Sequence, residues 1–255
     1  MPADSKDFLI AIPIYNEERY IPRVVSHVLE YADNVLVIDD GSTDRTPCLL
    51  GKLPVEVLRH ANNRGYGASL ADAFAFAALH DYQWVITMDC DEQHEPQAIP
   101  TFMKVALENR ADIISGSRYL SSLDTETAPP ADRRFINMEM TAEINARLGF
   151  SLTDSFCGFK AHRVSAMGRL NLTDAGYAFP MQLWAQAAAH GLRVSETPVK
   201  LIYKDLTRTF GEQLDDPKVR LAHYRCVLHT EIEQLAHLLP PEALQSLNPC
   251  GHFRR

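Results

Sequence analysis

WVITMDCD, residues 84–91, is the stretch that decides the fold, because an apolar run ends there in two carboxylates. Similar stretches occur earlier, namely FLIAIP at 8–13 and NVLVIDD at 34–40. Shorter apolar runs lie at 55–58 and 112–115, and apolar residues recur at helical spacing between the runs. Short apolar runs predict buried strands, and their alternation with helices is typical of a parallel sheet. We therefore predict an α/β protein with a mostly parallel central sheet and helices on both faces.

Polar residues follow four of the five predicted strands at their carboxyl ends. Tyr15 to Glu17, Asp39-Asp40, Asp89 to Asp91 and Ser117-Arg118 all occupy such positions. Ligands of open parallel sheets bind beyond the carboxyl ends of the strands. We therefore expect a ligand site at this edge of the sheet.

Composition narrows the function classes. The chain has 255 residues, 46% of them hydrophobic, and a formal net charge of -8. This charge argues against binding to nucleic acid, which usually requires a basic surface. No apolar run approaches the roughly 18 residues of a membrane span, so we expect no transmembrane segment. Five cysteines without zinc-knuckle spacing, and no signal-peptide pattern, predict reduced thiols in the cytoplasm.

The second half of the chain is less regular. Residues 120–135 are polar and contain two prolines, which predicts a connecting segment, and helices are expected at 136–148, 181–190 and 218–239. We divide the chain into a main domain, 1–214, and a C-terminal helical tail, 215–255. We expect the tail to pack on the domain; contact with a membrane surface and a homodimer are the alternatives.

Asp89-x-Asp91 is the sharpest local feature. Two carboxylates two residues apart, just past a buried strand, can point into one crevice and offer the oxygen ligands that Mg²⁺ or Mn²⁺ prefers. Gln93 and His94 lie near enough to contribute. A metal there would neutralise charge on a leaving nucleoside diphosphate. The alternative is a solvated acidic turn.

Two glycine-containing stretches have competing interpretations. Asp39-Asp40-Gly41-Ser42 could accept hydrogen bonds from a base or ribose, or form a turn before a capped helix. Gly65-Tyr66-Gly67 precedes a helix, but it follows the third strand and lacks a third glycine, so it does not indicate a dinucleotide site. We expect these glycines to let the loop pass close to a ligand or to backbone.

The ordered set of motifs resembles the inverting family-two glycosyltransferases with the Rossmann-like GT-A fold. Within them it is most similar to the dolichyl-phosphate or polyprenyl-phosphate mannosyltransferase and glucosyltransferase branch. The resemblance covers roughly residues 8–214. The matching stretches are Ile12 to Glu18, Val37 to Asp44, Asn63 to Gly67, Met88 to Pro96, Ser115 to Tyr119, Asp154 to Lys160, Gly176 to Phe179 and Arg208 to Glu212.

The resemblance implies a role for particular residues. The nucleoside would be held by Pro13, Tyr15, Glu17 and Asp40, with Cys90 also at the donor site. The metal would be bound by Asp89, Asp91 and Gln93, of which Asp91 also counts as catalytic. Diphosphate or acceptor phosphate would be met by Arg118 and Arg208, since a guanidinium is a planar, permanently charged fork.

The acceptor is indicated by what the chain lacks. Family-two enzymes that act on sugar hydroxyls usually carry a late acidic base and a Gln-x-x-Arg-Trp motif, and here Gln182 stands where an acid is expected. A phosphate acceptor is already anionic and needs no base. The resemblance thus implies transfer of a hexose from a GDP-mannose or UDP-glucose type of donor to a polyprenyl phosphate. One departure is Gln213-Leu214, where the branch commonly has Ser-Lys.

Three rival functions follow from the same residues. Transfer to a small soluble acceptor would fit a chain without a membrane span. A nucleotide-sugar binding module without turnover would fit the departures at Gln182 and Gln213-Leu214. A nucleotidyltransferase should carry a glycine-rich basic loop after its first strand, and Ile14 to Glu18 argues against it.

Overall fold

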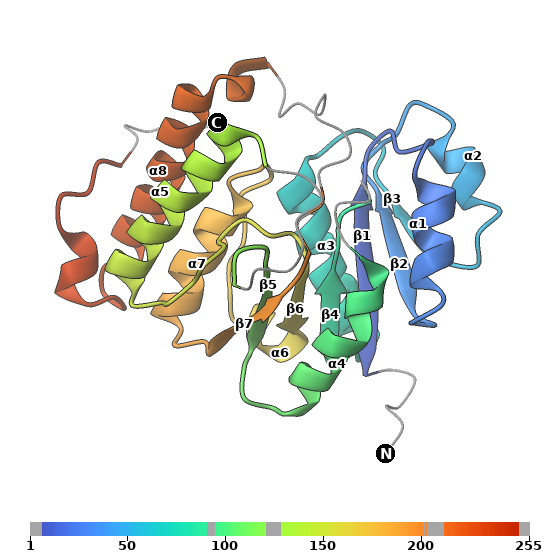
Figure 1. The fold of residues 1–255 in the computed structure, drawn as a ribbon, viewed down its shortest axis with the longest axis horizontal. Coiled ribbons are helices and arrows are strands. Elements are labelled where there is room, and N and C mark those ends of the chain that lie inside the picture. The colour runs from blue at the N-terminus through green and yellow to red at the C-terminus, as the bar shows by residue number, and fades with distance from the viewer. Residues whose placement is uncertain (1–6, 91–94, 121–128, 201, 203–211, 250–255) are drawn as a thin grey trace.

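In the part of the chain that the structure describes, seven strands form one central sheet in the order β3-β2-β1-β4-β6-β5-β7 (Figure 1). The computed structural model describes residues 7–90, 95–120, 129–200, 202 and 212–249. The strands are β1 Phe8–Ile14, β2 Val35–Asp39, β3 Glu56–Arg59, β4 Trp84–Thr87, β5 Ile113–Ser117, β6 Lys160–Arg163 and β7 Val194–Pro198. Only β6 runs antiparallel to its neighbours, β4 and β5. The prediction of a mostly parallel sheet is confirmed.

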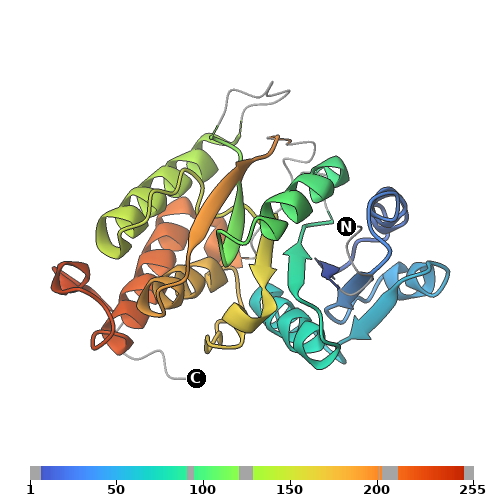
Figure 2. The same ribbon diagram turned by 90° about the horizontal axis from the view of Figure 1, so that it is seen from below.

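Helices cover both faces of the sheet, as the two perpendicular views show (Figures 1 and 2). The α-helices are α1 Ile21–Val28, α2 Thr46–Leu50, α3 Tyr66–Leu79, α4 Ile99–Leu107, α5 Ala131–Leu148, α6 Val164–Met167, α7 Phe179–Ala189 and α8 Pro217–Gln234. Short 3-10 turns lie at Pro96–Ala98, Glu212–Asp215 and Pro241–Leu244.

Alternation along each strand divides the core in two. In β1, Leu9 and Ala11 pack with α3, α5, α7 and α8, whereas Ile10 and Ile12 pack with α1, α2 and α4. Successive side chains of a strand point to opposite faces, so an uninterrupted apolar run supplies both cores at once. This arrangement fixes the carboxyl ends of β1, β2 and β4 beside one another.

Element bounds differ from the sequence predictions mainly in the second half. Helix α5 begins at Ala131, so residues 131–135, predicted as part of a connection, are helical. Helix α8 ends at Gln234 rather than near residue 239. Cys48, Cys90 and Cys157 are free thiols, but Cys226 is disulfide-bonded, so the expectation that every thiol is reduced is wrong for this residue.

The C-terminal helix α8 packs against the domain. Its Tyr224, Leu228 and Ile232 are buried in the same core as α5 and α7. Outside that core, Arg225 forms ion pairs with Glu139 and Glu143 of α5. None of the described helices is both long and apolar enough to cross a membrane. The division between 214 and 215 stays a prediction.

Candidate active site

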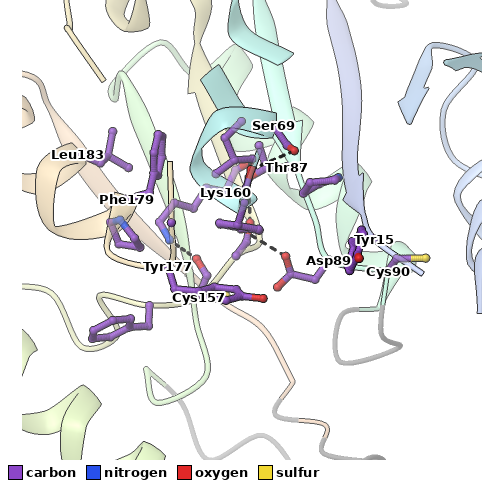
Figure 3. A pocket seen from close by; sticks show the side chains of 18 of the residues that line it. Tyr15, Ser69, Thr87, Asp89, Cys90, Cys157, Lys160, Tyr177, Phe179 and Leu183 are labelled. Atoms are coloured by element: carbon purple, nitrogen blue, oxygen red, sulfur yellow. Dashed lines mark hydrogen bonds between the residues drawn. The ribbon is translucent and has the colours of Figure 1, made fainter. Parts of the chain in front are cut away.

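A cavity of about 520 Å³ opens beyond the carboxyl ends of β1, β2 and β4 and extends to α5, α7 and α8. It brings together all the predicted site residues that the structure describes, which are Pro13, Tyr15, Glu17, Asp40, Asp89, Cys90 and Arg118. The other three, Asp91, Gln93 and Arg208, lie outside the described residues. Figure 3 shows the Asp89 carboxylate pointing into the cavity and the Cys90 thiol pointing the other way. Cys90 is buried in the core beneath it.

The loops after β1 and β2 are joined to each other around Asn16. This residue has a positive φ of 56°, and its side-chain oxygen accepts a hydrogen bond from the Thr43 amide at 2.8 Å. In return, the Asn16 amide donates to the Ser42 hydroxyl at 2.9 Å, and the Glu17 amide donates to the Thr46 hydroxyl at 2.9 Å. These bonds hold Tyr15 and Glu17 at the wall of the cavity.

Asp40 organises the next loop. Its buried carboxylate accepts from the amides of Arg64 and Gly65, at 2.7 and 2.8 Å, and lies 2.6 Å from Nδ1 of His60. His60 in turn lies 2.9 Å from Asp72. Asp40 therefore fastens the loop that follows β3 to the end of β2, while it still lines the cavity. Its contact with a base or ribose remains a prediction.

Gly67 lets a distant loop approach the start of α3. Its amide donates to the Ala175 carbonyl at 2.9 Å, and a Cβ at this position would lie 2.0 Å from the Asp174 carbonyl oxygen. Real Cβ atoms essentially never come so close, so only glycine fits here. The glycines of this stretch serve close approach to backbone, as the sequence analysis expected, and not a dinucleotide motif.

Asp89 stands between two neighbours at the end of β4. The Tyr66 hydroxyl donates to its Oδ1 at 3.3 Å, and Tyr66 itself stacks on Tyr177. On the other side, a Cβ on Gly158 would lie 2.4 Å from Oδ2, so the backbone of Gly158 packs directly on the carboxylate. These contacts hold the Asp89 carboxylate at the end of β4, and its role as a metal ligand stays a prediction. No group of three or more metal-binding side chains occurs among the described residues.

Arg118 is held by the fully buried Asp154. Its Nε and Nη2 donate to the two carboxylate oxygens at 2.6 and 2.9 Å. Burial alone raises the pKa of Asp154, but the Arg118 guanidinium and the donated hydrogen bonds outweigh it, so this pKa lies well below its ordinary value. Arg118 lines the cavity, whereas Asp154 does not.

Lys160 and His162 of β6 form the floor of the cavity. The Lys160 side-chain nitrogen donates to the Cys157 carbonyl (Figure 3). The same nitrogen lies 5.6 Å from the centre of the Trp184 ring. Burial lowers the pKa of Lys160 and lowers that of His162 to about 3, since both charged forms lose solvation. His162 is therefore neutral at physiological pH.

Acidic and basic side chains both line the cavity. We call Glu17, Asp40 and Asp89 the acidic end, and Arg118, Arg133, Lys160 and Arg220 the basic end. Arg220, on α8, pairs at 2.5 Å with Asp132, which does not line the cavity. Arg118 and Arg220 thus line the cavity, and each is paired with a carboxylate that does not line it.

Gln182 has a structural role instead of a place in the cavity. Its side-chain oxygen accepts from the amides of Thr173 and Asp174 at 2.6 and 2.8 Å, and its amide nitrogen donates to Glu231 at 3.0 Å. Burial raises the pKa of Glu231. The side chain that stands where an acid was expected therefore joins α7, α8 and the loop before α7.

Comparison with known proteins now places this geometry in a family. The model of "Glycosyl transferase family 2" matches residues 9–170, more than half of the chain. The chain belongs to glycosyl transferase family 2. In this family 2 glycosyltransferase, the match covers β1 to β6 and the whole acidic end, and it stops before α7 and α8.

Relatives of this family 2 glycosyltransferase include lipid-phosphate enzymes. The polyprenol monophosphomannose synthase of Mycolicibacterium smegmatis is 28% identical over 231 residues, which cover 85% of this chain and 86% of that protein. The undecaprenyl-phosphate mannosyltransferase of Micrococcus luteus is 26% identical, with 78% and 84% covered. Among solved structures, glucosyl-3-phosphoglycerate synthase from Mycobacterium tuberculosis in complex with UDP superposes with a TM-score of 0.69. It is 17% identical and the match covers 92% of this chain and 81% of that one, which confirms the GT-A fold.

Several cavity residues were not assigned a role from the sequence. Lys160 ends the stretch Asp154 to Lys160, which contributed to the family resemblance. The sequence did not predict that Lys160 lines the cavity. Tyr66 lies between Gly65 and Gly67, and only the two glycines were interpreted from the sequence. Arg133, Arg220 and Tyr224 lie on helices whose cavity-facing side no local pattern identifies.

Proposed function

We propose that this chain is a metal-dependent, inverting hexosyltransferase that moves mannose or glucose from a GDP- or UDP-sugar to a polyprenyl-phosphate type of acceptor. The observation that carries the proposal is that acidic and basic side chains line one cavity beyond the carboxyl ends of β1, β2 and β4. The named activities of the lipid-phosphate relatives support the choice of acceptor.

The acidic end is assigned to the donor. Tyr15 and Glu17 would flank the nucleoside, and Asp40 keeps the neighbouring loop in place through the amides of Arg64 and Gly65. Asp89 would hold Mg²⁺ or Mn²⁺, together with Asp91 and Gln93. The hard carboxylate oxygen of Asp89 suits either ion. When bound, the ion would neutralise negative charge on the diphosphate.

The basic end is assigned to the acceptor phosphate. An oxygen of that phosphate attacks the anomeric carbon of the sugar, and the bond from this carbon to the diphosphate oxygen breaks. The electron pair of that bond leaves with the nucleoside diphosphate, and because the attack comes from the face opposite the leaving group, the configuration at the carbon inverts. No proton has to be removed, because the acceptor is already an anion. Arg118, held rigidly by Asp154, is oriented before the substrates arrive.

The test is an assay of the purified protein with Mn²⁺ and labelled GDP-mannose or UDP-glucose, with and without a polyprenyl phosphate. We expect transfer to the lipid from one donor, and a product whose anomeric configuration by NMR is opposite to that of the donor. Retention of configuration would refute the inverting mechanism. Donor binding without any product over hours would instead support a binding module.

A compact phosphorylated acceptor is the second candidate. Arg220 and Tyr224 of α8 stand in the cavity wall, beyond the segment that the family model matches. Burial raises the pKa of Tyr224 to about 12, so its hydroxyl stays a neutral hydrogen-bond donor. A small phosphorylated acid in the same assay distinguishes the candidates, because transfer to it in preference to the lipid would favour the second.

A further inference from the structure

The turn from Asp154 to Gly158 touches the acidic end of the cavity. The Asp154 carboxylate closes this turn by accepting from the amides of Phe156 and Cys157 at 3.1 and 3.2 Å. The turn then places Gly158 against the Asp89 carboxylate, and the Gly158 carbonyl accepts from the Thr87 hydroxyl at 2.8 Å. The position of Asp89 is therefore set partly by a segment that follows it by about seventy residues of chain.

The same carboxylate reaches the basic end. Asp154 is 0% exposed, binds two nitrogens of the Arg118 guanidinium, and also accepts from the Asn137 side-chain amide at 2.7 Å. Asn137 is in turn held by the Thr141 hydroxyl at 2.9 Å. A buried carboxylate with so many donors has one orientation, because any rotation would leave charged or polar partners unpaired.

We propose that Asp154 is a positioning residue that fixes the Arg118 guanidinium and the Asp89 carboxylate relative to each other. Through one buried turn it holds the two ends of the cavity at the separation that both substrates require. This inference rests on the proposed function only in taking Asp89 to be part of the metal and diphosphate site. It predicts that a change at Asp154 weakens donor binding, although Asp154 does not line the cavity.

The test compares two carboxylate-to-amide substitutions, Asp154→Asn and Glu143→Gln. Glu143 also binds arginine, at 2.9 Å from Arg225 Nε, but it lies between α5 and α8 and does not line the cavity. Calorimetry with Mn²⁺ and UDP or GDP measures the donor end without any acceptor. We expect Asp154→Asn to raise Kd about 10-fold or more, because it weakens the turn that packs on Asp89, and groups that support a metal ligand typically contribute that much. Glu143→Gln should lower Tm but leave Kd within about twofold.

The outcomes distinguish a positioning role of Asp154 from a purely structural role. A folded Asp154→Asn protein that binds like the wild type overturns the inference, because a residue that serves only global stability would lower Tm without changing Kd. If Asp154→Asn does not fold, Asn137→Leu removes the hydrogen bond to the Asp154 carboxylate and the one accepted from Thr141, and should raise Kd about threefold. An unchanged Kd in that variant overturns the inference as well. Failure of the wild type to bind either nucleotide would count against the proposed function instead.

Discussion

The acidic end of the cavity is built from short loops that follow three neighbouring strands, whereas the basic end is assembled from β6, α5, α8 and the residue after β5. Each residue of the acidic end stands at or within a few positions of the end of a strand. The residues of the basic end are far apart in the sequence, from Arg118 to Arg220. A local motif can specify the first arrangement, but only the packing of the whole domain can specify the second.

The largest effect should come from removing the central group of the acidic end. Asp89→Ala is expected to lower kcat/KM about 10²- to 10³-fold, as the loss of one electrostatic group at a reacting centre does. Asp33→Ala, which removes an exposed carboxylate on the same domain, is the control and should leave the rate unchanged. If the Asp89→Ala protein kept more than a tenth of the wild-type rate, Asp89 would not be required for the reaction.

The contact between α3 and the loop before α7, both of which line the cavity, can be broken at Gly67. Gly67→Ala places a Cβ 2.0 Å from the Asp174 carbonyl oxygen and 3.0 Å from the Phe179 ring, so the loop before α7 must move away from α3. We expect a loss of about 1 to 3 kcal/mol in the free energy of unfolding. Gly51→Ala is matched to it, because its nearest neighbour lies 3.8 Å away. Equal stability of the two variants would show that this contact is dispensable.

The basic end can be loosened without touching the acidic end. Asp132→Asn removes the charge that pairs with the buried Arg220, whose side chain is 3% exposed. We expect the free energy of unfolding to fall by about 1 to 3 kcal/mol. This lies between the values for surface and buried ion pairs, because the Asp132 side chain is 37% exposed. Glu139→Gln breaks the exposed pair with Arg225 and should cost less than about 1 kcal/mol. Urea unfolding measures the loss of stability in both variants. A larger loss for Glu139→Gln than for Asp132→Asn would contradict the view that the Arg220 pair is the stronger one.

The smallest effect is a pH dependence of the contact between α5 and α8. Hydrogen bonds from His229, Arg225 and Arg147 lower the pKa of Glu143 to about 2, against the opposing effect of burial. The unfolded carboxyl binds its proton near 4.5, so this stabilisation is complete above that pH and is lost as the pH falls toward 2. The difference in unfolding free energy between wild type and Glu143→Gln should therefore shrink from pH 5 to pH 3. A constant difference would contradict it.

The sequence predicts one region of the molecule far better than the other. Strands β1, β2 and β4 are uninterrupted apolar runs that end in acids, so both their burial and the edge at which Asp40 and Asp89 meet can be inferred from local pattern. Strand β6, Lys160 to Arg163, contains two basic residues and a histidine, and no local pattern marks it as buried. Its burial follows from its place between β4 and β5, which only the complete topology reveals.

The roles within the site divide in the same way. The resemblance named Arg118, but the sequence could not show that Asp154 holds it, because their hydrogen bonds join residues 36 positions apart. The two hydrogen bonds between Arg118 and Asp154 form a salt bridge, which is the contact that an arginine on a loop most often makes. Likewise Gln182 marked a departure from an expected acid, and only its bonds to Thr173, Asp174 and Glu231 show that it serves packing.

Strand β5 pairs only with β6 and β7, and both come later in the chain. During synthesis, therefore, β1, β2, β3 and β4 can form their ladder as they emerge from the ribosome, while β5 waits for a partner until residue 160 and beyond have been made. At about 5 to 20 residues per second, that wait lasts seconds. The nascent protein thus exposes the apolar residues of β5 for that time. The turn at Asp154 to Gly158 that packs on Asp89 is made during the same interval, so a chaperone that shields β5 would act before the acidic end is complete.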